Sequence, residues 1–281
     1  MLIFSRQAEI QSHLSRVAGG KSIGFVPTMG ALHQGHLSLI NNSLQENDVT
    51  VVSIFVNPTQ FNNADDLAKY PRTLDADVAK IKSISPEVIV FAPSVDDMYP
   101  QKTQSDQFDF DGLEHQMEGR FRPGHFDGVG TIVKRLFEIV KPTRAYFGEK
   151  DFQQLQIVRK LVSKYKIPVQ IVGCPIHREP NGLAMSSRNE RLSAQQREQA
   201  SFIYKVLEQA KHYFATESAR RVGERVKKAF ENNRYFKLEY FEIADVDTLK
   251  SVSRKARNKK YRAFIAVFAG DVRLIDTVPL N

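Results

Sequence analysis

The stretch Phe25-Val26-Pro27-Thr28-Met29-Gly30-Ala31-Leu32-His33-Gln34-Gly35-His36 decides the fold near the start of this chain. It runs from an apolar segment, residues 23–26, through a Pro/Gly turn into a segment where apolar side chains recur at positions 37, 40 and 44. That spacing predicts a strand, a loop and the start of a helix. Such a junction presents unpaired backbone N–H groups and the positive end of a helix dipole, so it favours binding of a phosphate.

Two histidines lie in this junction, three positions apart, and the helical spacing places His33 and His36 on one face. They could be ordinary polar residues at a helix entrance. However, Gly35 between them and Gly30 in the turn remove side chains where a ligand would need room. We therefore interpret the pair as part of a binding site.

The composition is that of a globular protein, because 42% of the 281 residues are hydrophobic and 26% are charged. No apolar run approaches the roughly 20 residues that span a bilayer, and the first residues are not followed by a signal-peptide core. We expect a cytoplasmic protein with no membrane partner. The single cysteine, Cys174, lies in an apolar stretch and is expected to be an inert thiol.

The net charge of +8 could indicate nucleic acid, anionic small molecules or no specific partner. Much of the excess sits late in the chain, above all in the run 254–260 between two predicted elements. We interpret this run as a solvated loop, and we expect no nucleic-acid partner.

Strand and helix patterns alternate over the first 178 residues. Strands are predicted at 22–26, 49–56, 87–91, 144–147 and 169–172, and helices at 36–46, 74–83, 129–140 and 152–164. This alternation predicts a Rossmann-like α/β domain, residues 1–178, with a parallel sheet covered by helices on both faces.

The pattern changes over residues 179–281. Helices are predicted at 194–213 and 218–230, strands at 237–243, 263–268 and 273–276, and a hairpin turn at Gly270-Asp271. We therefore expect a smaller C-terminal α+β domain, joined to the first by a hinge at 178–184 and closing over the site.

Polar residues gather after the predicted strands, where an open parallel sheet binds its ligands. They are His33 and His36, Asn57 and Gln60, the run 148–151, and the segments 177–182 and 185–188. The irregular segment 93–127 is too long for a simple connection, and we expect part of it to cover the site.

These residue types suit transfer of a nucleotidyl or phosphoryl group. His33 and His36 can donate hydrogen bonds to phosphates, and Lys150 supplies a compact cation. Ser186 and Ser187 add hydroxyl donors, while the amides of Gln60 and Gln154 suit a polar second substrate. Met29 and the segment 129–132 are expected to form an apolar wall.

Two acids could hold a magnesium ion that bridges the phosphates. Asp75 and Asp77 lie at the start of the predicted helix 74–83. The same position equally suits acids that interact only with their own helix dipole, and the sequence leaves both interpretations open.

At this point a resemblance becomes specific. The His33-Gln34-Gly35-His36 run resembles the HxGH signature of the nucleotidyltransferase superfamily. Together with it, five further segments are similar to those of the pantothenate synthetases, the pantoate–β-alanine ligase family, and occur in the same order. They are Ser53-Ile54-Phe55-Val56-Asn57-Pro58-Thr59-Gln60-Phe61, Tyr70-Pro71-Arg72-Thr73, Arg122-Pro123-Gly124-His125-Phe126, Phe147-Gly148-Glu149-Lys150-Asp151-Phe152-Gln153-Gln154 and Met185-Ser186-Ser187-Arg188-Asn189.

The resemblance implies that ATP and pantoate form a pantoyl adenylate, which β-alanine then attacks to give pantothenate and AMP. It also implies a homodimer that uses Mg²⁺. Catalytic roles fall on His33, His36, Lys150, Ser186, Ser187 and Arg188. Pantoate would be held by Gln60 and Gln154, and Gln60 would also reach β-alanine. ATP would be bound by Met29, Gly30, Ala31, Leu32, His33, Gln34, Gly35, His36, Gly148, Glu149, Lys150, Asp151, His177, Met185, Ser186, Ser187 and Arg188.

This sequence departs from the family pattern at two positions. Thr59 stands where the family often has Met, beside Gln60, so the apolar contact there is expected to be looser. His177 replaces a small or apolar residue, which is harmless if only its backbone touches adenine.

Two other functions are compatible with parts of the pattern. One is a nucleotidylyltransferase of the same fold, whose product would remain a nucleotide conjugate. The other is a basic RNA-binding module, which only the net charge suggests.

Overall fold

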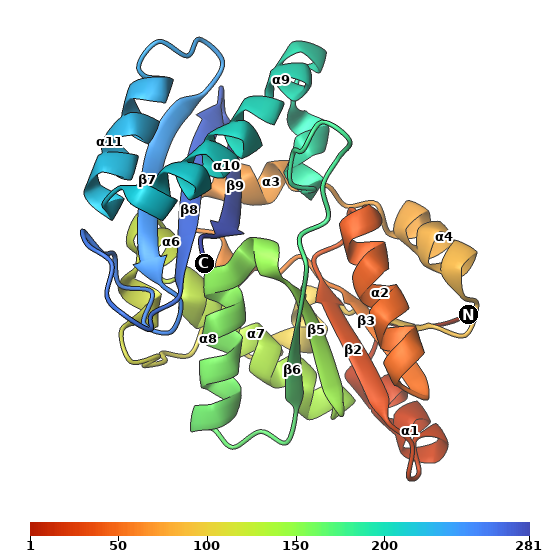
Figure 1. Cartoon of the computed structure of the whole chain (residues 1–281). Coiled ribbons are helices and arrows are strands. Elements are labelled where there is room, and N and C mark those ends of the chain that lie inside the picture. The colour runs from red at the N-terminus through yellow and green to blue at the C-terminus, as the bar shows by residue number, and fades with distance from the viewer.

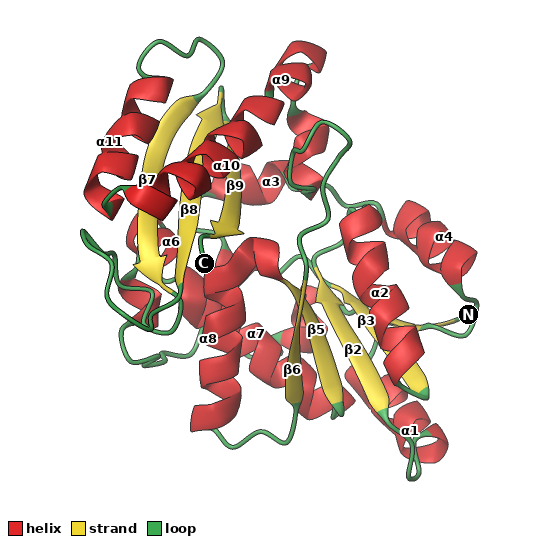
Figure 2. Cartoon of the chain, viewed as in Figure 1, coloured by secondary structure: helices red, strands yellow, loops and turns green.

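The computed structural model describes residues 1–281 and contains two separate sheets (Figures 1 and 2). The first is a six-stranded parallel sheet in the order β1-β4-β3-β2-β5-β6. Its strands are, in that order, Leu2–Phe4, Ile89–Phe91, Val49–Ile54, Ile23–Thr28, Arg144–Gly148 and Gln170–Cys174. The predicted α/β class and parallel sheet are therefore confirmed.

Helices cover both faces of this sheet, because alternate strand residues point to opposite faces. Phe25 and Val51 belong to a core shared with α1, α7 and α8, whereas Val26 and Val52 belong to a core shared with α2 and α4. The bounds of these helices are α1 Gln7–Val17, α2 Gln34–Glu46, α4 Leu74–Ile84, α7 His125–Val140 and α8 Phe152–Lys164.

The order of the strands reverses between β2 and β5. From β2 the chain runs outward through β3 and β4 on one side, where β1 forms the edge of the sheet, and then through β5 and β6 on the other side. At such a switch point the loops that follow two neighbouring strands diverge and leave a crevice at their carboxyl ends. The loop 29–33 follows β2 at this point, and the segment 149–151 follows β5.

The second sheet is antiparallel, in the order β7-β8-β9, with strands Lys237–Asp245, Tyr261–Ala269 and Val272–Pro279. Helices α10 (Ser201–Thr216) and α11 (Ala219–Phe230) pack on one face (Figure 1). The other face contributes Tyr240 and Phe264 to the large core of the first sheet. Gly270 forms the predicted β8–β9 hairpin turn, with φ at +64°.

Short elements connect these parts. They are η1 (Pro58–Gln60), α3 (Ala64–Lys69), α5 (Val95–Met98), η2 (Leu113–His115), α6 (Met117–Phe121), η3 (Glu149–Asp151), η4 (Ser187–Arg191) and α9 (Ala194–Gln199). None of the helices combines the length and the apolar character that crossing a membrane requires.

Two features differ from the sequence prediction. The first strand and first helix, β1 and α1, were not predicted; the strand has only three residues, and its side chains at Leu2 and Ile3 are exposed. The single helix predicted over 194–213 is two helices. At Ala200 the backbone makes tighter i→i+3 hydrogen bonds, and helical periodicity does not distinguish such a break.

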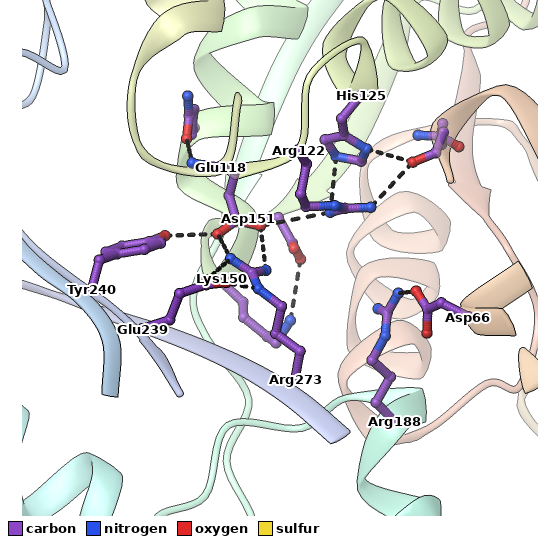
Figure 3. A network of polar contacts seen from close by, with 12 residues as sticks. Asp66, Glu118, Arg122, His125, Lys150, Asp151, Arg188, Glu239, Tyr240 and Arg273 are labelled. Carbon is purple, nitrogen blue, oxygen red and sulfur yellow. Dashed lines mark hydrogen bonds and ion pairs between the residues drawn. The ribbon is translucent and has the colours of Figure 1, made fainter. Parts of the chain in front are cut away.

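A buried ion pair joins the second sheet to α6 (Figure 3). Arg273 of β9 donates two hydrogen bonds of 2.7 Å to the carboxylate of Glu118 in α6. Tyr240 of β7 donates a third, also of 2.7 Å, to the same carboxylate. These bonds hold the pKa of Glu118 at about 2 against the effect of burial.

We predict that Arg273→Ala lowers the free energy of unfolding by roughly 3–5 kcal/mol, because it leaves the Glu118 carboxylate buried without its main cation. Urea denaturation at neutral pH measures this. The matched control is Arg220→Ala, which removes an exposed pair with Glu224 and should cost at most about 0.5 kcal/mol. If the two variants lost similar stability, the buried pair would not hold the second sheet to α6.

Candidate active site

A cavity of about 210 Å³ lies at the carboxyl ends of β2 and β5. The structure brings most of the predicted site residues to its wall: Met29, His33, Gly35, His36, Gln60, Gly148, Lys150, Asp151, Gln154, His177, Met185, Ser186, Ser187 and Arg188. One side is the predicted apolar wall, formed by Met29 together with Val129 and Ile132 of α7. Polar and apolar walls thus face each other across one pocket, as in small-molecule sites.

Five residues expected to bind ATP do not line this cavity. Gly30 and Leu32 are buried beneath the loop, Ala31 forms its turn, and Gln34 points to solvent at the start of α2. Glu149 instead forms an ion pair of 2.7 Å with Arg262 of β8. A contiguous motif contributes alternate side chains to the site and to its support, and for this reason the whole motif cannot line one wall.

Asp77 anchors the loop that carries the histidines. Its buried carboxylate accepts the backbone N–H groups of Ala31 (2.9 Å) and Leu32 (2.7 Å) and the hydroxyl of Thr73 (3.2 Å). These bonds stabilise a turn in which Ala31 has φ at +49°, a conformation that costs energy in a residue with a Cβ. Both carboxylate oxygens of Asp77 thus support the loop, an arrangement that argues against the magnesium role that the sequence left open.

The loop fixes the protonation of His36. The backbone N–H of His33 donates to Nδ1 of His36 over 3.3 Å, so the neutral ring carries its proton on Nε2. Burial and the nearby Lys150 cation lower the pKa of His36 to about 4. At neutral pH the cavity wall thus contains an uncharged imidazole with one N–H to donate.

His33 packs against His36, with ring centroids 3.9 Å apart, and burial lowers its pKa to about 2. A Cβ at position 35 would lie 3.0 Å from the His33 ring. Gly35 therefore makes room for a histidine ring, whereas the sequence suggested room for the ligand.

Cations and hydroxyls lie across the cavity from the histidines. Lys150 is largely buried, with Nζ 3.6 Å from Asp151. The hydroxyl of Ser187 donates to the backbone oxygen of Ala31 (3.0 Å), so it connects η4 to the histidine loop. Ser186 accepts the backbone N–H of Arg188 and keeps its own proton available to a ligand.

Arg188 lines the cavity but also bonds to Asp66 of α3 over 2.7 Å (Figure 3). Asp66 is a residue that the sequence did not single out, since an acid in a short surface helix carries no signal. Phe55, Tyr70 and Tyr146 also line the cavity unpredicted, because their aromatic side chains read as ordinary core.

Two adjacent glutamines in α8 have different surroundings: one is bonded within the protein, and the other faces the cavity. The Gln153 amide is buried and bonded to the backbone of Leu113, Gln116 and Glu118 at 2.9 Å each. Gln154, one residue further, lines the cavity, and none of the hydrogen bonds within the protein uses its amide. The sequence preference for Gln154 is compatible with this arrangement.

The segment 93–127 does not cover the site, contrary to expectation, since none of its residues lines the main cavity. Glu118, Arg122 and His125 border a small adjoining space of about 30 Å³ on the side of Lys150 and Gln154. The segment therefore supports the site from beneath, where α6 packs against the second sheet.

Known proteins match this chain along its length. The family model described as Pantoate-beta-alanine ligase matches residues 2–279. The chain belongs to the pantoate–β-alanine ligase family.

Relatives named pantothenate synthetase are similar throughout. That of Flavobacterium psychrophilum is 63% identical over 100% of both chains, and that of Christiangramia forsetii is 56% identical over 98% of both. A crystal structure from Thermus thermophilus is 38% identical, with a TM-score of 0.91 over 100% of this chain and 99% of that one. One from Francisella tularensis, described as complexed with β-γ ATP and β-alanine, is 37% identical, with a TM-score of 0.83 over 100% and 98%.

The buried histidines predict how stability depends on pH. The pKa values of His33, His36 and His125 are lowered to about 2, 4 and 3, below the ordinary 6.5. Between pH 6.5 and 4.5 these histidines therefore bind protons in the unfolded chain but stay neutral in the folded chain. The free energy of unfolding should be highest above pH 6.5 and should fall as the pH drops through this window.

Denaturation with urea at a series of pH values measures this slope. His36→Asn removes one of the three groups and keeps an acceptor for the His33 N–H, so it should reduce the slope by about a third. An unchanged slope would mean that His36 takes up its proton in the folded protein.

Proposed function

We propose that this chain joins pantoate to β-alanine at the expense of ATP, through a pantoyl adenylate, releasing pyrophosphate and AMP. The observation that carries the proposal is that one cavity combines the paired histidines, Lys150 and Ser186 with the free amides of Gln60 and Gln154. Family membership along the chain supports it, as does the Francisella tularensis relative described with β-γ ATP and β-alanine.

In the first step a carboxylate oxygen of pantoate attacks the α-phosphorus of ATP. A phosphorus–oxygen bond forms, the bond to the β-phosphate breaks, and pyrophosphate leaves with its electron pair. His36 Nε2–H and Lys150 lie where they can stabilise the charge that develops on the phosphates. His36 is neutral and hydrogen-bonds without giving up its proton, because phosphoryl chemistry needs positioning and charge stabilisation.

In the second step the neutral amine of β-alanine attacks the acyl carbon of the adenylate. A carbon–nitrogen bond forms, the carbon–oxygen bond to AMP breaks, and the amine proton is lost to solvent. Gln60 and Gln154 hold the pantoyl group in place between the two steps, so the adenylate stays next to the incoming amine.

For Mg²⁺, the residues of the chain do not form a protein cage, since no three His, Cys, Asp or Glu side chains converge on one point. Mg²⁺ usually keeps several waters and binds through substrate phosphates. We therefore propose that it enters on the triphosphate, and we assign it no protein ligand.

The arrangement of the chain adds three further proposals. Residues 1–178 and 179–281 act as separate domains, with a hinge at 178–184, where Gly182 has φ at +93°. The C-terminal domain closes over the site and expels water before adenylation. The chain forms a homodimer in the cytoplasm, as the family resemblance implies.

Product analysis tests the proposed function. With ATP, pyrophosphate should appear only when pantoate is present, and AMP should appear only after β-alanine is added. Release of pyrophosphate that ignores pantoate would exclude the ligase and favour a nucleotidylyltransferase. Salt-dependent binding of arbitrary RNA at physiological ionic strength would instead favour the RNA-binding alternative.

The two adjacent glutamines give a matched prediction. Gln154→Ala should raise the KM for pantoate by roughly tenfold or more and leave the free energy of unfolding within about 0.5 kcal/mol. Gln153→Ala should lower that free energy by roughly 1–3 kcal/mol, since it leaves buried backbone groups unpaired. If Gln154→Ala destabilised the fold and left the KM for pantoate unchanged, while Gln153→Ala raised that KM, the role given to Gln154 would be wrong.

A further inference from the structure

The backbone of Gln60 is held by two side chains from the segment that follows α6. Nδ1 of His125 donates to the carbonyl oxygen of Gln60 over 2.8 Å, and the guanidinium of Arg122 donates to the same oxygen over 3.1 Å. Figure 3 shows His125 and Arg122 side by side above the Glu118 network. A single carbonyl that receives two buried donors is fixed more firmly than one in an ordinary turn.

The donor on His125 is defined by its surroundings. A second N–H of Arg122 lies 3.3 Å from Nε2 of His125, and because a guanidinium can only donate, Nε2 accepts and Nδ1 carries the proton. Burial and Arg122 lower the pKa of His125 to about 3, so the ring stays neutral. Glu118 lies 3.6 Å from Arg122 and keeps the guanidinium in place.

The turn that bears Gln60 also rests directly on α7. A Cβ at Gly128 would lie 2.2 Å from the backbone oxygen of Thr59 and 2.9 Å from the backbone nitrogen of Gln60. The side chain of Asn57 donates to the Gly128 carbonyl over 3.2 Å. Without a side chain at position 128, η1 sits closer to the helix than any other residue would allow.

The side chain of Gln60, unlike its backbone, makes no hydrogen bond within the protein. It lines the cavity. A fixed backbone with an unengaged amide is the arrangement that a recognition residue needs, because the ligand then meets a preorganised donor and acceptor.

We propose that His125 and Arg122 are positioning residues that aim the Gln60 amide at the polar groups of the hydroxy acid substrate. This inference rests on the proposed function, in which Gln60 holds pantoate. His125 touches neither substrate nor the reacting atoms; it acts through the carbonyl of Gln60. Its hydrogen bond therefore affects affinity for the hydroxy acid. Affinity for ATP depends on the histidine loop and should not depend on this bond.

Two substitutions separate the hydrogen bond from packing. His125→Asn places an amide N–H near the position of Nδ1 and should restore the bond to Gln60. His125→Leu fills similar space without a donor. His115→Asn, at an exposed histidine in η2, is the matched control for the chemical change.

The expected result is that His125→Leu raises the KM for pantoate by roughly tenfold, while the KM for ATP stays within about twofold of the parent. His125→Asn should recover most of the pantoate affinity, and His115→Asn should behave as the parent. The side-chain amide NMR signals of Gln60, assigned with Gln60→Ala, should shift or broaden in His125→Leu alone, in the protein without substrates.

Equal rises in both KM values, or Gln60 amide signals in His125→Leu that match the parent, would overturn the inference. If His125→Leu fails to fold, the smaller change Arg122→Gln, with the same two readouts, decides the question. Because the NMR comparison needs no substrate, it tests the positioning even if the parent enzyme proves not to use pantoate, a result that would overturn only the proposed function.

Discussion

One hydrogen bond sets the chemistry of the site, the bond from the backbone N–H of His33 to Nδ1 of His36. It leaves the proton of the neutral ring on Nε2, on a side chain that lines the cavity. The loop can make this bond because Asp77 holds the N–H groups of Ala31 and Leu32 and so keeps Ala31 in a left-handed turn. The Asp77 carboxylate, by holding the loop, thus determines which ring nitrogen of His36 carries the proton that a ligand in the cavity can accept.

The remainder of the fold places partners around this donor. The reversal of strand order between β2 and β5 brings Lys150 to the rim opposite the histidine loop. Ser187 bonds to the backbone of Ala31 and so links η4 to the loop. On the far side, the Glu118 to Arg273 pair joins the second sheet to the segment that supports Gln60. Each wall of the cavity is therefore held by hydrogen bonds or ion pairs within the protein, and these are present without a ligand.

Much of this architecture could be predicted from the sequence, and the exceptions have physical causes. Strong periodicity identified the sheet and its helices, and the HxGH run with Lys150 located the cavity. Composition could not show that Asp77 accepts two backbone N–H groups, because an acid at a helix start looks the same whether it binds a metal or a loop. Long-range pairs such as Asp66 with Arg188 leave no local pattern, since their partners are 122 positions apart.

The protonation of His36 can be measured directly. Long-range ¹H–¹⁵N spectra of the protein without substrates, assigned with a His36→Asn variant, report which ring nitrogens carry protons. At pH 7 they should show a neutral ring with its proton on Nε2 and an acceptor at Nδ1, since its pKa is lowered to about 4. An imidazolium with both nitrogens protonated, or a neutral ring protonated on Nδ1, would contradict the claim that the loop fixes the proton of His36 on Nε2 before ATP binds.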